Sequence, residues 1–240
     1  MKSSLLILCL LGSIYSSSQI SDSIKIEGIG LFKIGKTTVS SIEELSKKFS
    51  TKIKSTNSSS DLYNLTTNNN KIIIQLFADT VKTYNSPSYT SYSSNVKTYR
   101  IIGYSAADIE LNDLTVKFYN DTLYYMNCNM SSDLNNAIKL KYGEGKIEVK
   151  EKEVVCKNRS TGIERKLIEK TYFQKWDHDD IMAVSILSEY YNDKCERRLV
   201  SALTIESFSI GRVVNKIDDE IEDRLKERKK IEDKKKLDGF

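Results

Sequence analysis

The residue pattern with the clearest chemical meaning lies close to the start of the chain. Residues 30–37 read Gly-Leu-Phe-Lys-Ile-Gly-Lys-Thr and match the pattern of a phosphate-binding P-loop. Its defining positions are Gly30, Gly35, Lys36 and Thr37. In a P-loop, backbone amides hold phosphate, the lysine reaches the terminal phosphates and the threonine binds magnesium. The bulky apolar residues between the glycines are typical of a strand, so we expect a strand ending at Gly35 and a helix start at 37–40. Nucleotide binding is the least favoured alternative.

A second candidate is the acidic cluster Asp177-His178-Asp179-Asp180, which follows Trp176. Carboxylates at alternate positions of a turn can bind calcium, and a histidine beside an aspartate can act as a base. The glycine and the distal glutamate of a calcium loop do not follow. We expect a solvated hairpin tip here, with a weak divalent-cation site at Asp177, Asp179 and Asp180 as the alternative.

Other catalytic sets find little support in the sequence. The chain has one His and 4 Cys, without zinc-ligand spacing, and it has no Gly-x-Ser-x-Gly elbow. Acidic residues far apart in sequence can still converge in a glycosidase-like pair, and the 14 Tyr could line a sugar- or peptide-binding surface. We predict no catalytic residue and no cofactor, and keep an exported hydrolase or carbohydrate-binding enzyme using Asp/Glu and Tyr as the main alternative.

Residues 1–18 have the layout of a secretory signal peptide: a basic start, an apolar run at 5–11 and a small-residue exit. The apolar run is shorter than the roughly 20 residues that a membrane-spanning helix needs. We predict cleavage after Ser18, a secreted or periplasmic protein and no transmembrane segment after cleavage.

Three cysteines then remain, and an oxidising compartment permits one disulfide between them. Three pairings can be drawn. We favour Cys156 with Cys195, because each lies at the end of a predicted strand beside a polar turn. Cys128 follows an apolar run and is expected to be a buried free thiol.

The charge of the chain argues against a nucleic-acid partner. The formal net charge is +4, and 37 basic residues are interspersed with 33 acidic ones. A nucleic-acid-binding protein usually gathers its basic residues on one face. We therefore expect an unknown protein or a cell-envelope component as partner.

Periodicity predicts an α+β fold, a mostly antiparallel sheet with two short helices packed on one face and a longer charged C-terminal helix. The first short helix starts at Ser40, which has capping-box spacing to Glu43, and carries Ile42, Leu45 and Phe49 on one face; the second covers 131–142. Strands are expected at 24–34, 71–77 and 100–104 and in a hairpin at 114–126. Further strands are expected at 146–156, 164–176, 180–190 and 197–208. Residues 54–70 and the tyrosine-rich 84–99 are expected to be loops.

The coarse plan divides the chain into a signal peptide at 1–18, an α+β domain at 19–211 and a C-terminal helix within 212–240. The domain has two segments of similar plan, at 19–110 and 111–211, each with one capped helix followed by strands. In the final helix Val214, Ile217, Ile221 and Leu225 form an apolar stripe, and acidic residues precede basic ones. This helix is expected to be solvated, with docking to a partner as the alternative.

Three short stretches carry a family resemblance. The signal-like start with Gln19 after it, Lys33-Ile34-Gly35-Lys36-Thr37-Thr38 and Leu140-Lys141-Tyr142-Gly143 together resemble uncharacterised exported proteins of Bacteroidetes type. The second stretch also resembles β-lactamase-inhibitor-protein-like periplasmic α+β modules, a resemblance that implies protein binding through a sheet face and no catalytic residue. The tyrosine-rich loop and the charged helix are not part of that module. The favoured function is that of an exported non-enzymatic protein acting through protein–protein or cell-envelope contacts.

Overall fold

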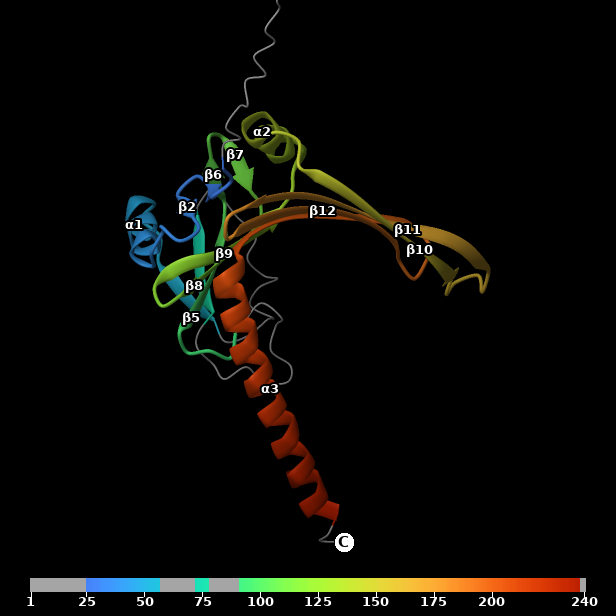
Figure 1. The fold of residues 1–240 in the computed structure, drawn as a ribbon. Coiled ribbons are helices and arrows are strands. Elements are labelled where there is room, and N and C mark those ends of the chain that lie inside the picture. The colour runs from blue at the N-terminus through green and yellow to red at the C-terminus, as the bar shows by residue number, and fades with distance from the viewer. Residues whose placement is uncertain (1–24, 57–71, 78–90, 238–240) are drawn as a thin grey trace, which may run out of the picture.

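The computed structural model of the chain describes residues 25–56, 72–77 and 91–237. Within them an α+β fold is built from three helices, one mixed sheet of nine strands and two small antiparallel sheets (Figure 1). The expected signal peptide, residues 1–18, lies outside the described residues. The elements in chain order are β1 (Gly28–Ile29), β2 (Phe32–Lys33), α1 (Ser40–Lys48), β3 (Ile53–Thr56), β4 (Ile73–Phe77), β5 (Val96–Ile102), β6 (Tyr104–Ala106), β7 (Ile109–Leu111), β8 (Leu114–Tyr119), β9 (Thr122–Asn129), α2 (Ser132–Tyr142), β10 (Lys146–Lys157), β11 (Glu164–His178), β12 (Ile181–Tyr191), β13 (Arg197–Ser207) and α3 (Phe208–Leu237).

The large sheet has the strand order β10-β11-β12-β13-β9-β8-β5-β4-β3. Neighbouring strands run antiparallel except β3 and β4, which run parallel and pair Ser55 with Leu76. The expectation of a loop from residue 54 is therefore wrong for 54–56. This polar stretch can form a strand because β3 lies at the sheet edge, where one side needs no strand partner.

Strands β10 to β13 are long and extend beyond the rest of the sheet, and we call them the wing. Figure 1 shows the wing arching away from α2, with α3 on its concave side. The alternating apolar residues of this region predicted four strands, and the observed bounds lie close to the expected ones. The wing is thus a continuous antiparallel surface with two faces, one convex and one concave.

The main core lies on the α2 side of the sheet. One cluster of buried side chains includes Ile42 of α1 and Leu134 and Ile138 of α2. It continues into the base of the wing through Trp176, Ala183, Leu203 and Ile205. The indole Nε1 of Trp176 also donates a hydrogen bond to the carbonyl of Gly143, 3.0 Å away. Apolar burial and this bond together fix α2 against the wing, since each large buried apolar side chain contributes roughly 1.5–3 kcal/mol.

The two short helices differ in how they begin. The hydroxyl of Ser131 caps α2 by accepting a hydrogen bond from the backbone N–H of Leu134, as the sequence predicts. Helix α1 has Val39 at its N-cap and no side-chain cap, so the expected capping box at Ser40 is wrong. Ser40 is already inside the helix, and its hydroxyl lies 2.7 Å from that of Thr38.

Helix α3 packs on the opposite face of the sheet from α2. Val214 is buried against Val96 and Tyr124, and the side chains beyond Leu225 are exposed through residue 236. The carboxylate of Asp218 accepts hydrogen bonds from the hydroxyl of Ser91 and the backbone N–H of Tyr92, each 2.7 Å long. The first half of α3 is therefore held by the sheet, and its second half is surrounded by solvent.

The tyrosine-rich stretch at 84–99 is described only in part. Residues 84–90 lie outside the described residues, and β5 begins at Val96, earlier than the expected start at 100. The strand starts early because Val96 and Tyr99 are both buried, the first against Val214 of α3.

Candidate functional site

The P-loop-like residues 30–37 form the turn and second strand of the β1–β2 hairpin and the segment that follows it. Gly30 lies in the turn between β1 and β2 with a positive φ of 57°, and the strand residue Phe32 is fully buried. The hydroxyl of Thr37 donates to the carbonyl of Leu31 and accepts from the N–H of Lys33, both at 2.8 Å. The Thr37 hydroxyl is thus engaged by its own hairpin, and β2 ends at Lys33, two residues before the expected strand end at Gly35.

The lysine of the pattern is also engaged within the chain. Lys36 Nζ lies 2.7 Å from a carboxylate oxygen of Glu27, and helix α1 begins only at Ser40. Gly35 has a φ of 74° and donates its N–H to the carbonyl of Leu123. These residues do not form the loop between a strand and a helix N-terminus that holds phosphate in a P-loop.

A small cavity of about 290 Å³ lies beside this hairpin and α2. Its charged lining residues are Lys33 and Lys141. Burial, followed by the nearby charge of Lys141, lowers the pKa of Lys33, whose ammonium donates to the carbonyl of Gly28 at 3.2 Å. Lys33 therefore fastens the β1–β2 hairpin rather than reaching outward.

The acidic cluster forms the β11–β12 turn and caps helix α3. The carboxylate of Asp180 accepts hydrogen bonds from the backbone N–H and the hydroxyl of Ser209, each 2.7 Å long, and from the hydroxyl of Ser207. The backbone carbonyl of Asp180 accepts a hydrogen bond from the backbone N–H of Phe208. The hydroxyl of Ser207 accepts one from the backbone N–H of Ile210. The first N–H groups of α3 are thereby satisfied, which explains why this helix begins at Phe208, before the expected 212.

The other acidic residues of the cluster point to different surroundings. Asp179 lies 3.2 Å from the ammonium of Lys25 and 2.7 Å from Nε2 of His178, and Asp177 is exposed. Within the part of the chain that the structure describes, no group of three or more His, Cys, Asp or Glu side chains has an arrangement that could hold a metal ion. The cluster thus forms the β11–β12 turn, and its Asp180 carboxylate caps helix α3.

The cysteines are arranged as the favoured pairing predicts. Cys156 and Cys195 form a disulfide, with 5.8 Å between their Cα atoms. It joins β10 to the β12–β13 turn at the far end of the wing, where Arg159 and Asp193 form an ion pair at 2.8 Å. Cys128 is a buried free thiol, and burial raises its pKa to about 12. The disulfide holds the two hairpin tips of the wing together.

The most extensive unusual surface is the convex face of the wing. Residues opposite one another in an antiparallel register share a face, so the pairings place Val149, Tyr172 and Leu187 in one row. Six large apolar side chains on this face are between 39% and 64% exposed, and we call them the convex patch: Ile147, Val149, Val155, Ile168, Leu187 and Leu199.

The concave face is less apolar at its surface. Its most exposed large apolar side chains are Tyr190 and Val200, at 40% and 52%. Phe173 is covered by the ammonium groups of Lys150 and Lys175, whose Nζ atoms lie 5.1 and 5.7 Å from the ring centre. The two faces of one sheet thus differ in how much apolar surface they leave to solvent.

Charges between the convex-patch residues are largely paired with one another. Lys170 lies 2.7 Å from Glu151, and Lys157 lies 3.3 Å from Glu164. Arg197 forms a further ion pair with Glu189 on the same face. Exposed pairs of this kind stabilise the fold little, at about 0–1 kcal/mol each. Their effect on the surface is to leave it with alternating, mutually compensated charge.

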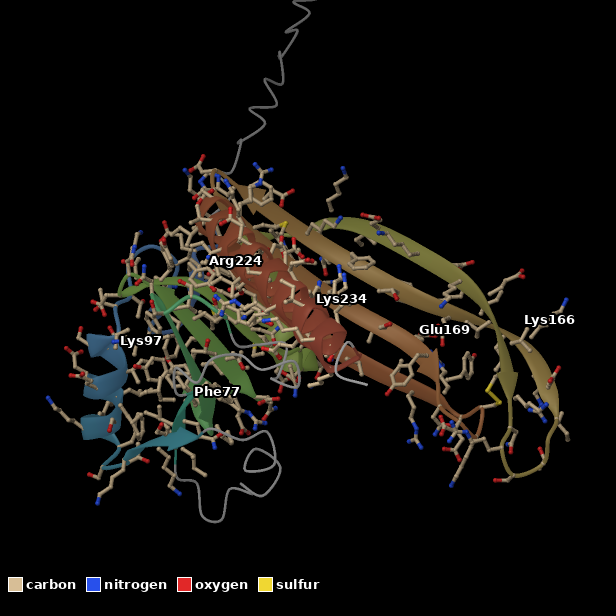
Figure 2. All side chains as sticks on the ribbon, turned by 90° about the horizontal axis from the view of Figure 1, so that it is seen from below. Phe77, Lys97, Lys166, Glu169, Arg224 and Lys234 are labelled. Carbon is tan, nitrogen blue, oxygen red and sulfur yellow. A yellow bond between two sulfur atoms is a disulfide. The ribbon has the colours of Figure 1, made fainter. Side chains whose placement is uncertain are left out.

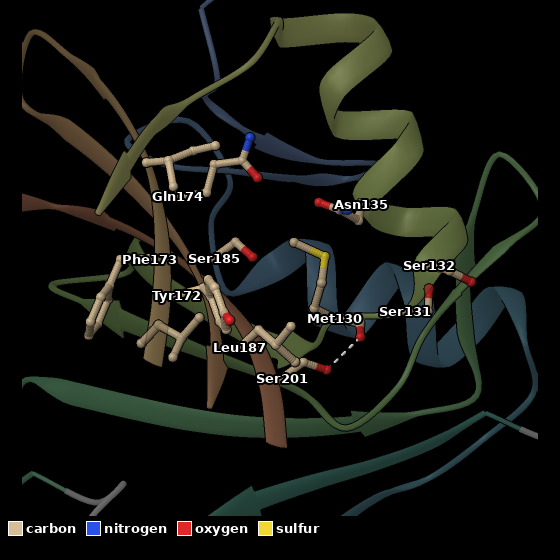
Figure 3. Close-up of a pocket in the computed structure, with 12 residues that line it drawn as sticks. Met130, Ser131, Ser132, Asn135, Tyr172, Phe173, Gln174, Ser185, Leu187 and Ser201 are labelled. Carbon is tan, nitrogen blue, oxygen red and sulfur yellow. Dashed lines mark hydrogen bonds between the residues drawn. The ribbon is translucent and has the colours of Figure 1, made fainter. Parts of the chain in front are cut away.

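A cavity of about 410 Å³ lies at the base of this face, below the start of α2 (Figure 3). Ile147, Tyr172 and Leu187 of the convex face contribute to its wall. Figure 3 shows the side chains of Asn135 and Gln174 facing each other across it. The convex patch and the cavity are therefore continuous.

No protein-family model, curated protein or solved structure matches the chain. Among the helices of residues 25–56, 72–77 and 91–237, none has the length and apolar character that crossing a membrane requires. The convex patch and the cavity are the features that sequence reasoning missed. The alternation of residues 183, 185 and 187 predicts that they share one face of a strand. It does not show at which residue this face ceases to be buried by the rest of the protein.

Proposed function

We propose that the protein is an exported, non-enzymatic binding protein that docks another protein on its convex patch. The exposure of six large apolar side chains on one face of one rigid sheet carries this proposal. Large exposed apolar patches with polar residues around them mark interaction sites on soluble proteins. The disulfide at the wing tip supports the rigidity of the arm and accords with an oxidising compartment.

The character of the surface favours a protein as the occupant. Apolar side chains alternate with ion pairs such as Lys170–Glu151, a mixture typical of protein interfaces. A nucleic acid would require a concentration of unpaired basic side chains. The resemblance to periplasmic inhibitor modules, which bind proteins through a sheet face, supports the same proposal.

The shape of the wing favours a different protein over a second copy of this chain. Figure 1 shows the wing as an arch with α3 on its concave side. The strand registers place the convex patch on the other face, which Trp176 and Leu203 share. Two convex surfaces would meet along a narrow strip, whereas a concave partner could cover all four strands. The partner we infer therefore presents a concave apolar surface with charges of both signs around it.

The exported hydrolase that the sequence left as an alternative gains less support. The residues that line the 410 Å³ cavity include no Asp and no Glu. A hydrolase of the glycosidase type needs two carboxyl groups flanking the reacting bond. The cavity is consequently proposed as a binding feature and not as a reaction site.

Site-specific photo-crosslinking tests the proposal in the cells that produce the protein. A photoreactive amino acid replaces Leu199 on the convex face or, as a matched control, the adjacent Val200 on the concave face, residues that are 59% and 52% exposed. We expect one protein adduct of defined mass from position 199 and none of that mass from position 200. Equal adducts from both positions, an adduct with a second copy of this chain, or no adduct from position 199 would contradict the proposal.

A further inference from the structure

We propose that the 410 Å³ cavity between the start of α2 and the convex face of the wing binds a neutral sugar residue. Its volume lies within the range of small-molecule sites, about 300–1,000 Å³. None of its described lining residues carries a charge. A phosphate, a carboxylate or a metal ion would therefore lose its hydration without gaining an opposite charge, and these ligands are disfavoured.

A hydroxyl that a largely buried serine aims into the cavity shows where a polar ligand atom would lie. Ser185 is only 9% exposed, and no hydrogen bond joins its hydroxyl to another described residue. Figure 3 shows this hydroxyl pointing into the cavity, toward Met130 and α2. A serine hydroxyl both donates and accepts hydrogen bonds, so the Ser185 hydroxyl can bond with a ligand in the cavity.

Amide side chains extend this polar surface on both walls. Asn135 projects from α2, and Gln174 projects from β11 on the opposite side (Figure 3). A side-chain amide both donates and accepts hydrogen bonds, as does a serine hydroxyl. A ligand rich in hydroxyl groups, each also a donor and an acceptor, matches this set of uncharged partners.

The rest of the wall is apolar and includes the aromatic residues Tyr172 and Phe173. Tyr172 of β11, Leu187 of β12 and Met130, which lies between β9 and α2, also line the cavity. A sugar ring has C–H bonds on its faces and hydroxyls at its edge, so an aromatic side chain can cover a face while amides and hydroxyls bind the edge. A fatty acyl chain would bury the polar groups of Ser185 and Asn135 without partners.

This inference goes beyond the proposed protein partner, and it rests on the polar lining of the cavity, although Ile147 and Leu187 belong both to the cavity wall and to the convex patch. The ligand could be a free monosaccharide or the terminal unit of a glycan, because both present the same ring and hydroxyls. Leu199, on which the protein-docking test depends, does not line the cavity. The two proposals can therefore fail independently.

The test is a binding measurement on the full folded chain by calorimetry and by NMR of the Met130 methyl group. The probes are glucose, galactose and N-acetylglucosamine, the linear tetramers of glucose and N-acetylglucosamine, and palmitate. We expect at least one neutral saccharide to bind and to shift the Met130 resonance. Stronger binding of a tetramer than of its monomer would identify a glycan end, and equal binding would identify a free sugar.

Two substitutions and one control locate the binding. Ser185→Ala and Tyr172→Ala should each weaken saccharide binding at least about tenfold. Tyr190→Ala removes a tyrosine from the concave face of the same wing and should leave binding unchanged. Ser185→Ala keeps the packing of the strand, so it tests the hydroxyl even if Tyr172→Ala perturbs folding. Saccharide binding that survives Ser185→Ala unchanged, palmitate binding in the cavity, or no saccharide binding at about 10 mM would overturn the proposal.

Discussion

Asp180 in the β11–β12 turn binds both the backbone N–H and the hydroxyl of Ser209 in the first turn of α3. This contact joins two elements that differ in sequence position by 29 residues. It connects the base of the wing to the helix that runs along the other side of the sheet. The angle between wing and helix is consequently fixed by a hydrogen-bonded cap as well as by packing.

Asp180→Ala should lower the free energy of unfolding by about 1 kcal/mol, because it removes the side-chain cap of α3. Urea unfolding at neutral pH, followed by far-ultraviolet circular dichroism, measures this difference. Asp179→Asn is the matched control in the same turn, because asparagine tolerates the positive φ of 49° at this position. It removes the charge that faces Lys25 and His178 at an exposed site and should change stability by less than about 0.5 kcal/mol.

The effect of Asp180 should depend on pH in a defined direction. Hydrogen bonds from Ser207 and then from Ser209 lower the pKa of Asp180 below its usual 3.8. A carboxyl group with a lowered pKa in the folded state stabilises the fold above its unfolded pKa and loses this contribution as the pH falls through the folded pKa. The stability difference between wild type and Asp180→Ala should therefore shrink below about pH 3.8. A difference that grew on acidification would contradict the cap.

Reduction of the Cys156–Cys195 disulfide should loosen the tip of the wing. The bond closes a span of 39 residues, for which the chain-entropy account gives a stabilisation of roughly 3–4 kcal/mol. Hydrogen exchange followed by mass spectrometry should show faster exchange in the Cys156→Ser/Cys195→Ser variant at both hairpin tips. Exchange in β8 and β9 should stay slow, since these strands belong to the core. Uniform acceleration over the whole chain would show that the bond acts globally instead.

Cys128 should be unreactive in the folded protein. Burial raises the pKa of its thiol to about 12, so the reactive thiolate is scarce at pH 8. Maleimide labelling with peptide mapping should find Cys128 unmodified under native conditions and modified in about 6 M guanidinium chloride, which unfolds most domains. Rapid native labelling at this position would mean that β9 opens far more often than its packing suggests.

The sequence allowed the elements to be predicted better than their arrangement in space. The alternation in 180–190 identified β12, and Ser131 identified the start of α2, because both signals are local. The cap on α3 was not predictable, since Asp180 is distant in sequence and follows a different strand. The predicted capping box at Ser40 was wrong because the chain already turns helically at Val39.

The convex patch was hidden from sequence reasoning for a related reason. Leu187 and Leu203 face the same side of the sheet, and both are typical of a buried strand position. Leu203 is 1% exposed and Leu187 is 39% exposed. The difference arises from how far the wing extends beyond the helices that cover the core, which no local pattern encodes. The same is true of the cavity, whose polar residues come from α2 and from the wing.

The central claim is that the convex face of the wing is the surface that binds a partner protein. Once crosslinking has identified the partner, its affinity for Leu199→Asp and for Val200→Asp tests this claim most directly. These neighbouring residues have similar exposure and point to opposite faces, so both variants carry the same added charge. We predict that Leu199→Asp weakens binding at least about tenfold and that Val200→Asp leaves it within about twofold of wild type. Equal weakening by both variants, or loss of binding in Val200→Asp alone, would contradict the claim.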